Sequence, residues 1–262
     1  MISKTIHVLV DERGVAQLTL ARPEKHNALS AEMIDDLTAA IHDLGHDKTV
    51  RVVVLAGEGA SFCAGGDLGW MRAQFDATRA GRMVEARRLA MLFKALNELP
   101  KPLVARVHGN AFGGGIGILS VCDLVIAAST ARFGLTEVRL GIIPATISPY
   151  VVARIGEANA RPLFLSGKII DAWQAHAAGL LSRVVPEEAL DEAVEAEVRH
   201  FLAASPQAAA RAKALARSVG RPITDGMIDH VVEQLADAWE SEEAKEGVAA
   251  FFEKRPPNWR EA

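Results

Sequence analysis

Short apolar runs rich in β-branched residues alternate with amphipathic stretches along the first two thirds of this chain. Residues 5–10 and 15–20 have the pattern of two strands joined by a polar turn at 11–14, which predicts a hairpin. Further runs are apolar throughout, as expected of strands buried on both faces, at residues 50–56, 103–107 and 124–128. The pair Val184-Val185 ends the β-like material.

Helical patterns separate these runs. Ser30 is a suitable N-cap for a helix that extends to about residue 44, with Met33, Ile34, Leu37 and Ile41 on one face. Residues 57–66 have the composition of a loop, and helical residues follow it to about residue 97. Other helical stretches cover residues 146–155, 158–165, 187–203, 206–218 and 222–254. Strands alternating with helices predict an α/β fold with largely parallel strands.

The helical section after residue 187 has few strands to cover. Its apolar residues share one face, as shown by Met227, Val231, Leu235 and Trp239. Such a face can pack on another subunit or cover the core of its own chain, and the pattern alone leaves both interpretations open.

Composition narrows the class of protein. Half of the 262 residues are apolar, enough for a substantial core, and the formal charge of −4 argues against nucleic acid as the main partner. The two cysteines, Cys63 and Cys122, have no metal-binding spacing and indicate reduced, buried thiols. The first residues have no long apolar segment of the kind found in a signal peptide or membrane anchor. We therefore expect a soluble cytoplasmic protein with no membrane partner.

Glycines cluster where a predicted strand gives way to a predicted helix, at Gly113, Gly114, Gly115 and Gly117. Close helix–strand packing is one explanation, and a ligand that approaches the backbone is the other. A dinucleotide fingerprint is excluded because residue 118 is Ile where its last glycine is required. The free N–H groups at a helix start suit a phosphate or a developing oxyanion.

Six stretches together resemble the crotonase (enoyl-CoA hydratase/isomerase) superfamily, in its order and spacing and over nearly the whole chain. They are ARPEKHNALS (21–30), FCAGGDL (62–68), VHGNAFGGG (107–115), CDLVIA (122–127), FGLTEVRLGIIP (133–144) and AFFEKRPP (250–257).

The resemblance implies a spiral core of ββα units over residues 1–200 and a C-terminal helical trimerisation region over residues 201–262. It implies an acyl-CoA thioester as substrate, with coenzyme A as part of that substrate and no further cofactor or metal. It also implies a homotrimer, or a homohexamer built as a dimer of trimers.

The resemblance also assigns the chemistry. Backbone N–H groups of Ala64 and Gly114 are expected to bind the thioester oxygen, and Glu137 is expected to transfer protons. Two-carboxylate hydratases of the family carry another Glu at the position of Gly117, so this chain retains one acid of the pair.

One acid leaves the reaction type open. Hydration of a 2-enoyl-CoA is our leading hypothesis; Δ3,Δ2-enoyl-CoA isomerisation and a non-catalytic acyl-CoA-binding or interaction protein are the alternatives. Residues 136–152 and 67–71 resemble the bacterial methylglutaconyl-CoA or carboxygeranoyl-CoA hydratases, which implies a branched substrate with a second carboxylate. The sequence does not identify a cation to meet that carboxylate.

The same motifs supply candidates for substrate binding. Basic Arg22, Lys25 and Lys254 and aromatic Phe251 are expected near coenzyme A, and the loop and glycine residues near the thioester. The full set is Arg22, Lys25, Ala28, Gly65, Gly66, Asp67, Leu68, Gly113, Phe251 and Lys254. His108 and Cys63 are interpreted as structural, and Asp67, Asp76 and Glu85 as the reserve acids should Glu137 not serve.

Overall fold

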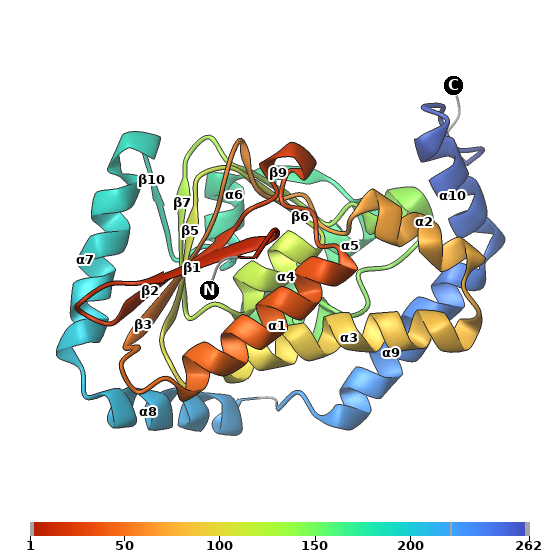
Figure 1. Cartoon of the computed structure of the whole chain (residues 1–262). Helices are drawn as coiled ribbons and strands as arrows, with labels where there is room; N and C mark the ends of the chain where they lie inside the picture. Colours follow the sequence, from red (N-terminus) through yellow and green to blue (C-terminus); the bar gives the residue numbers. More distant parts are fainter. Residues whose placement is uncertain (1–2, 221, 260–262) are drawn as a thin grey trace.

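The computed structural model describes residues 3–220 and 222–259 and contains a six-stranded sheet with a smaller sheet beside it (Figure 1). The larger sheet has the order β1-β2-β3-β5-β7-β10. Its strands are β1 (Ile6–Val10), β2 (Val15–Leu20), β3 (Val52–Gly57), β5 (Leu103–Val107), β7 (Leu124–Ala128) and β10 (Arg183–Val185). β1 pairs antiparallel with β2, as the predicted hairpin requires, and each later neighbour pairs in parallel.

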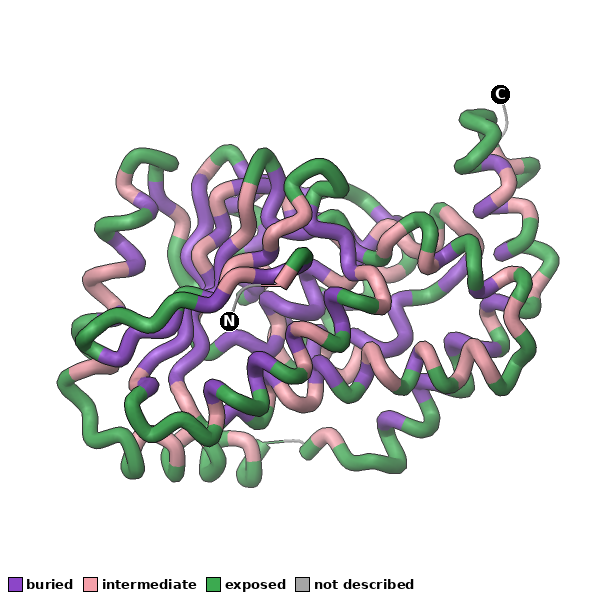
Figure 2. The backbone as a smooth tube through the Cα atoms, in the orientation of Figure 1, coloured by how far each residue is buried: buried purple, intermediate pink, exposed green. Residues whose placement is uncertain are grey.

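Both faces of this sheet are buried, as the apolar runs predict (Figure 2). On one face Val52, Val54 and Val104 pack against the apolar side of α7. The residues between them in the strands, such as Val53 and Leu55, point to the opposite face and pack in the main core. Fully burying such side chains contributes about 1.5–3 kcal/mol each, so the central strands anchor the fold.

The smaller sheet has the order β4-β6-β8-β9. Its strands are β4 (Ser61–Cys63), β6 (Asn110–Phe112), β8 (Arg132–Gly134) and β9 (Ile169–Asp171). The hydrophobic pattern missed these strands, and β4 lies inside the stretch predicted as loop, because three residues are too few to establish a period of two. The parallel pair β4–β6 brings the loop after Cys63 beside the glycines after Phe112.

The helices follow the predicted pattern with additional breaks. They are α1 (Ala31–His46), α2 (Leu68–Asp76), α3 (Arg79–Glu98), α4 (Gly114–Val121), α5 (Ser148–Ser166), α6 (Ala172–Ala177), α7 (Leu190–Ala203), α8 (Pro206–Val219), α9 (Asp225–Glu240) and α10 (Glu242–Phe252), with 3-10 turns η1 (Pro23–Lys25), η2 (Glu137–Leu140) and η3 (Glu187–Ala189). Ser30 caps α1 by accepting a hydrogen bond of 3.2 Å from the Met33 N–H. The predicted helix over 222–254 is divided at Ser241, whose hydroxyl accepts from the Ala244 N–H at 3.0 Å and so starts a new helix.

Helices α9 and α10 pack on their own chain and form part of a second apolar core. Ile228, Val231 and Trp239 of α9 are buried together with residues of α2, α3 and the segment after η2. Of the four residues named for the apolar face of α9, Val231, Leu235 and Trp239 are buried on their own chain, whereas Met227 is 46% exposed. The division at residue 200 and the trimeric or hexameric assembly stay predictions.

Helix α10 approaches η2 closely enough to exclude side chains at the contact. A Cβ atom on Gly247 would lie 2.5 Å from the Leu140 carbonyl oxygen and 2.8 Å from the Trp259 ring. A Cβ on Gly141 would lie 2.6 Å from the Ala244 nitrogen. The helix therefore rests directly on the backbone of the turn that begins at Glu137.

This contact predicts that Gly247→Ala lowers the free energy of unfolding by about 1–3 kcal/mol, the usual range for overpacking. Urea denaturation measures the effect. Gly226→Ala is the matched control, because Gly226 is exposed in α9 and the nearest atom to its added Cβ is 3.8 Å away. The control should leave stability unchanged or raise it by up to about 1 kcal/mol. Equal effects of the two substitutions would contradict the close packing of α10.

Candidate active site

Two backbone loops meet at the C-terminal ends of β4 and β6. The carbonyl of Gly65 accepts a hydrogen bond of 2.7 Å from the Leu29 N–H, and the Asp67 N–H donates to the Leu29 carbonyl at 3.0 Å. On the other loop the Gly113 N–H donates to the Gly134 carbonyl at 3.0 Å. A Cβ on Gly65 would lie 3.6 Å from the Gly113 Cα. The loops are in backbone contact, and hydrogen bonds to neighbouring segments fix both of them.

The N–H groups of these loops differ in what they bind. The Ala64 N–H donates to the His26 carbonyl at 2.9 Å, so it is not available to a substrate oxygen, and the expectation that Ala64 is a donor needs correction. Among the described residues, none accepts a hydrogen bond from the N–H of Gly66 or Gly114. Gly114 is the first residue of α4, where N–H groups have no partner within the helix. Free donors are therefore present in both loops, at Gly66 and Gly114.

An ion pair holds the first loop in place. The Arg22 guanidinium donates to the Ala28 carbonyl at 2.7 Å and to Asp67 Oδ2 at 3.0 Å, with both side chains largely buried. The other oxygen of Asp67 caps α2 by accepting from the Gly69 N–H. Burial acts to raise the pKa of Asp67, but these hydrogen bonds and the Arg22 charge lower it below its ordinary value. Arg22, Ala28 and Asp67 thus shape the loop around Gly66 and do not line the main cavity.

Glu137 begins η2 and places its carboxyl group against the second loop. A Cβ on Gly113, whose φ is +47°, would lie 3.0 Å from Glu137 Oε1. Glu137 Oε2 is buried and has no hydrogen-bond partner among the described residues. Burial raises the pKa of Glu137 from 4.5 to about 7, because the ionised form loses its hydration. The carboxyl group can therefore gain or lose a proton near neutral pH.

Gly117 lies where the family places a second acid, and its surroundings admit no side chain. A Cβ there would overlap Ile147 and lie 2.9 Å from the Phe93 ring. Ile147 lines the cavity, whereas Gly117 does not. The missing carboxylate is thus replaced by packed hydrocarbon, which makes Glu137 the acid of this cavity among the described residues.

A cavity of about 480 Å³ brings these groups together. It lies within the range of roughly 300–1,000 Å³ that is usual for small-molecule sites. Its lining is mainly apolar and includes these predicted site residues: Ala64, Gly65, Gly66, Leu68, Gly113, Gly114, Glu137 and Phe251.

The remaining predicted residues lie elsewhere. Lys25 and Lys254 are exposed, and their side chains form no ion pair with a described residue. Of the reserve acids, Asp67 is paired with Arg22, and Glu85 accepts from Trp70 Nε1 at 3.0 Å and from Arg88 at 2.6 Å. None of the reserve acids lines the cavity.

The interpretation of Cys63 and His108 as structural residues stays a prediction. Burial raises the pKa of the Cys63 thiol to about 12, so the reactive thiolate is not formed at neutral pH. His108 Nε2 lies 2.7 Å from the Gly59 carbonyl oxygen. Within residues 3–220 and 222–259, no cluster of His, Cys, Asp or Glu side chains is arranged to hold a metal ion, and no helix is long and apolar enough to cross a membrane.

Sequence reasoning missed three kinds of cavity residue. It assigned the donor of the first loop to Ala64, since the hydrogen bond from Ala64 to His26 joins residues far apart in the chain. It placed Trp239 on an apolar helix face without linking it to the cavity. It also omitted Arg139, the one basic side chain among the described cavity residues. The available signal for Arg139 was its position two residues after Glu137.

The buried carboxyl group predicts a pH-dependent stability. A raised pKa in the folded state adds stability below pH 4.5, and this contribution is lost as the pH rises to about 7. Glu137→Gln removes the titration, so the variant should become more stable relative to the native chain as pH rises from about 4 to about 8. The shift corresponds to roughly 3 kcal/mol, from 1.36 kcal/mol per pKa unit.

Urea unfolding at several pH values measures this difference. Glu192→Gln, at an exposed position in α7, controls for the loss of one negative charge. A difference between Glu137→Gln and the native chain that is constant over this pH range would show that the carboxyl group titrates normally.

Comparisons with known proteins place the chain in a family. The family profile for Enoyl-CoA hydratase/isomerase matches residues 11–262. An enoyl-CoA hydratase of Alternaria alternata is 37% identical, with 93% of this chain and 80% of that protein covered. A crystal structure of an enoyl-CoA hydratase from Mycobacterium avium has a TM-score of 0.88 at 33% identity and covers 99% of this chain and 100% of its own.

A second solved structure, an enoyl-CoA hydratase from Mycobacterium smegmatis, has a TM-score of 0.80 at 35% identity, over 98% of this chain and 99% of its own. These matches extend over both sheets and the C-terminal helices, and they confirm the α/β crotonase-like fold. With the profile match over nearly its full length, the chain belongs to the enoyl-CoA hydratase/isomerase family.

Proposed function

We propose that this protein is an enoyl-CoA hydratase that adds water to the double bond of a 2-enoyl-CoA thioester. The observation that carries the proposal is the Glu137 carboxyl group, buried in an apolar cavity with a pKa of about 7. A group with that pKa is half ionised near neutral pH and can act as base and as acid in one turnover. The free N–H groups of Gly66 and Gly114 in the same cavity can stabilise negative charge on the thioester oxygen.

The thioester carbonyl oxygen binds at these two N–H groups, with Gly66 in place of the expected Ala64. When oxygen adds to Cβ, negative charge moves through Cα to the thioester oxygen and gives an enolate. Donors held in place before the reaction stabilise that charge without reorganising. The Arg22–Asp67 ion pair and the bonds to Leu29 hold the Gly66 peptide for this purpose.

Glu137 handles the proton on its own. The ionised carboxylate takes a proton from water as the water oxygen bonds to Cβ. The neutral carboxyl group then returns that proton to Cα, the enolate collapses to the thioester, and Glu137 is ionised again. Protons and charge balance without a second acid, which agrees with the hydrocarbon packing around Gly117.

Isomerisation is the second candidate, and the same observation at Gly117 favours it. A single carboxylate can remove a proton from C2 of a 3-enoyl thioester and return it to C4, with the enolate held by the same N–H groups. That reaction needs no water. A non-catalytic acyl-CoA-binding protein is the third candidate, but such a protein has no use for a protonable carboxyl group beside free oxyanion donors.

The acyl group is proposed to be a hydrocarbon chain, and a branched chain is consistent with the cavity. A second carboxylate, as in methylglutaconyl-CoA, would need a cation. Arg139 is the one basic residue among the described cavity residues, and it is exposed. The buried part of the lining is mainly apolar, with Thr146 as a buried polar residue and Glu137 as the one acid among its described residues, so it favours an uncharged acyl end. Lys25 and Lys254 are proposed to meet coenzyme A phosphates outside the cavity.

A substrate panel tests the proposal. Crotonyl-, 3-methylcrotonyl-, 3-methylglutaconyl- and 3-hexenoyl-CoA are compared by initial rates, with water addition followed by loss of the enoyl absorbance and product identity by mass spectrometry. We expect hydration of an uncharged 2-enoyl thioester to be fastest. Clean conversion of 3-hexenoyl- to 2-hexenoyl-CoA without hydration would establish the isomerase, and binding without turnover of any member would establish the non-catalytic protein.

Glu137→Gln should lower kcat by about 10²- to 10⁴-fold or more while acyl-CoA binding stays nearly intact, because the amide keeps the size of the side chain but cannot take up a proton. Steady-state kinetics and calorimetric binding measure the two quantities. Gly114→Val is the contrasting variant: its side chain would collide with Leu29, whose Cδ1 is 2.8 Å from an added Cβ, so binding should fall as well. A Glu137→Gln rate above about a tenth of the native value would mean that another acid serves.

A further inference from the structure

The cavity has an exposed end and a buried end. Its exposed apolar residues are Leu68, Ile143, Ile169 and Phe251, which are between 37% and 48% accessible. One set of its buried apolar residues comes from α2, α9 and the segment after η2, and no more than 8% of each is accessible. They are Met71, Ile142, Ala145, Leu235 and Trp239. Leu29, Ile34 and Ile147 also line the cavity and are buried, but they belong to the main core, where Leu29 and Ile147 lie against Gly114 and Gly117. The set from α2, α9 and the segment after η2 forms a separate part of the lining, which we call the buried end.

The buried end belongs to the second apolar core. Met71, Ile142, Ala145, Leu235 and Trp239 are all members of that one cluster. None of these side chains is charged, and an ionised group at this end would lose its hydration without a partner. The wall therefore suits the end of a hydrocarbon chain, and its largest side chain is the Trp239 indole.

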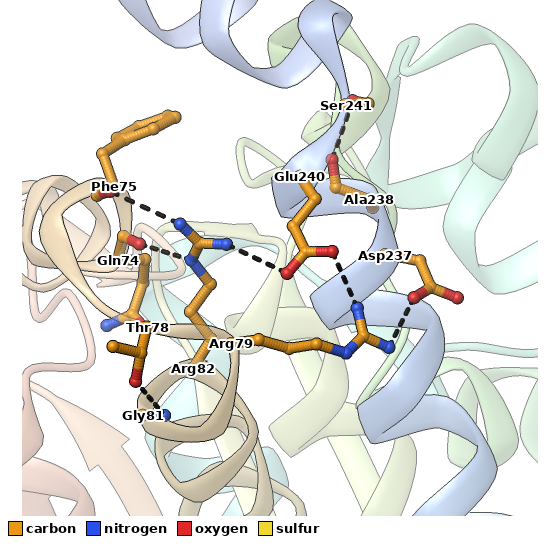
Figure 3. A network of polar contacts seen from close by, with 10 residues as sticks. All are labelled: Gln74, Phe75, Thr78, Arg79, Gly81, Arg82, Asp237, Ala238, Glu240 and Ser241. Atoms are coloured by element: carbon orange, nitrogen blue, oxygen red, sulfur yellow. Dashed lines mark hydrogen bonds and ion pairs between the residues drawn. The ribbon is translucent and has the colours of Figure 1, made fainter.

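Trp239 is held in a fixed position. Its ring meets Phe75 of α2 edge to face, with centroids 5.0 Å apart and planes at 82°. Arg82 joins the two helices next to this contact, as Figure 3 shows. Its guanidinium donates to the Gln74 carbonyl at 2.6 Å and to the Phe75 carbonyl at 3.4 Å, and it lies 3.5 Å from Glu240 Oε1.

Arg79 strengthens the same connection by pairing with Asp237 at 2.6 Å and with Glu240 at 2.9 Å (Figure 3). The Arg82 side chain is 13% exposed, so its contacts are less screened by solvent than those of a surface pair. The last turn of α9 is thereby tied to the end of α2 and the start of α3. These contacts restrain the indole, so an acyl chain that reaches it cannot displace it easily.

We propose that Trp239 is a specificity-determining residue that limits the length of the hydrocarbon acyl chain the enzyme accepts. The inference rests on the proposed function for its link to turnover, and on the cavity alone for its link to binding. The acyl chain extends from the thioester at Gly66 and Gly114 toward α2 and α9 and ends at the indole. Ala145 belongs to the same buried set and has its smallest side chain, so a larger residue there takes space from the acyl chain.

Two substitutions with opposite effects test the proposal. Trp239→Phe keeps an aromatic ring against Phe75 but is smaller, and Ala145→Val adds two methyl groups to the same end. The chain-length profile is measured as kcat/KM for crotonyl-, hexenoyl-, octenoyl- and decenoyl-CoA. Trp239→Phe should raise the ratio of the longest to the shortest substrate by about tenfold or more, and Ala145→Val should lower it by a similar factor, as expected for a methylene-sized change in an apolar pocket.

Trp173→Phe is the matched control, because Trp173 is 60% exposed on α6 and lies outside the cavity. Its profile should equal that of the native chain. Dissociation constants of the same thioesters, measured by calorimetry, should shift in parallel. An unchanged profile in Ala145→Val, or the same shift in Trp173→Phe, would overturn the proposal even if Trp239→Phe proves too unstable to assay.

The outcomes also separate this inference from the proposed function. If the native chain hydrates the panel but the profile does not respond to residues 145 and 239, the length limit is wrong and the hydratase stands. If the native chain hydrates nothing, the proposed function fails, and the dissociation constants still decide whether Trp239 ends the acyl site.

Discussion

The site depends on how closely Glu137 approaches the backbone of Gly113. A buried carboxyl oxygen that, like Glu137 Oε2, has no hydrogen-bond partner in the described part of the chain is unfavourable for stability. The absence of a side chain at position 113 makes room for the carboxyl group, and the η2 turn is pressed into place by α10. The same burial that destabilises the ionised form gives the group its neutral-range pKa. Burial of this one carboxyl group thus lowers the stability of the fold at neutral pH and makes the group able to transfer protons there.

The position of Ile147 explains why the described lining of the cavity has one acid: hydrocarbon fills the space that a second acid would occupy. In the two-carboxylate pattern the residue at 117 would share the proton transfer. Here the space is filled by Ile147 and Phe93, so adding an acid at 117 would require both neighbours to move. The single-carboxylate arrangement is therefore built into the packing of α4 against Phe93 of α3 and Ile147 before α5, and a point substitution at 117 would not convert it into the other.

Much of the fold follows from the sequence, because its long elements satisfy local rules. The runs that form β2, β5 and β7 were recognised with the bounds that the structure has, and Ser30 caps α1 as its side-chain chemistry predicts. The short strands β4, β6, β8 and β9 were not recognised, since three residues carry too little pattern and are held by tertiary hydrogen bonds. The family motifs proposed Glu137 and Gly114 from sequence, and both line the cavity. Gly66 could not be distinguished from Ala64, because the difference is a hydrogen bond to His26 that appears only on folding.

The cavity is assembled from residues spread along nearly the whole chain, from Leu29 before α1 to Phe251 near the end of α10. The glycine loops and Glu137 are synthesised in the first part, whereas Leu235, Trp239 and Phe251 come from the last helices. During synthesis, which proceeds from the N-terminus, the sheets can form while this apolar cavity is still open on the side that α9 and α10 will cover. The site is therefore closed only when the last helices have been synthesised and have docked, so competence to bind an acyl chain is one of the final properties that the folding chain acquires.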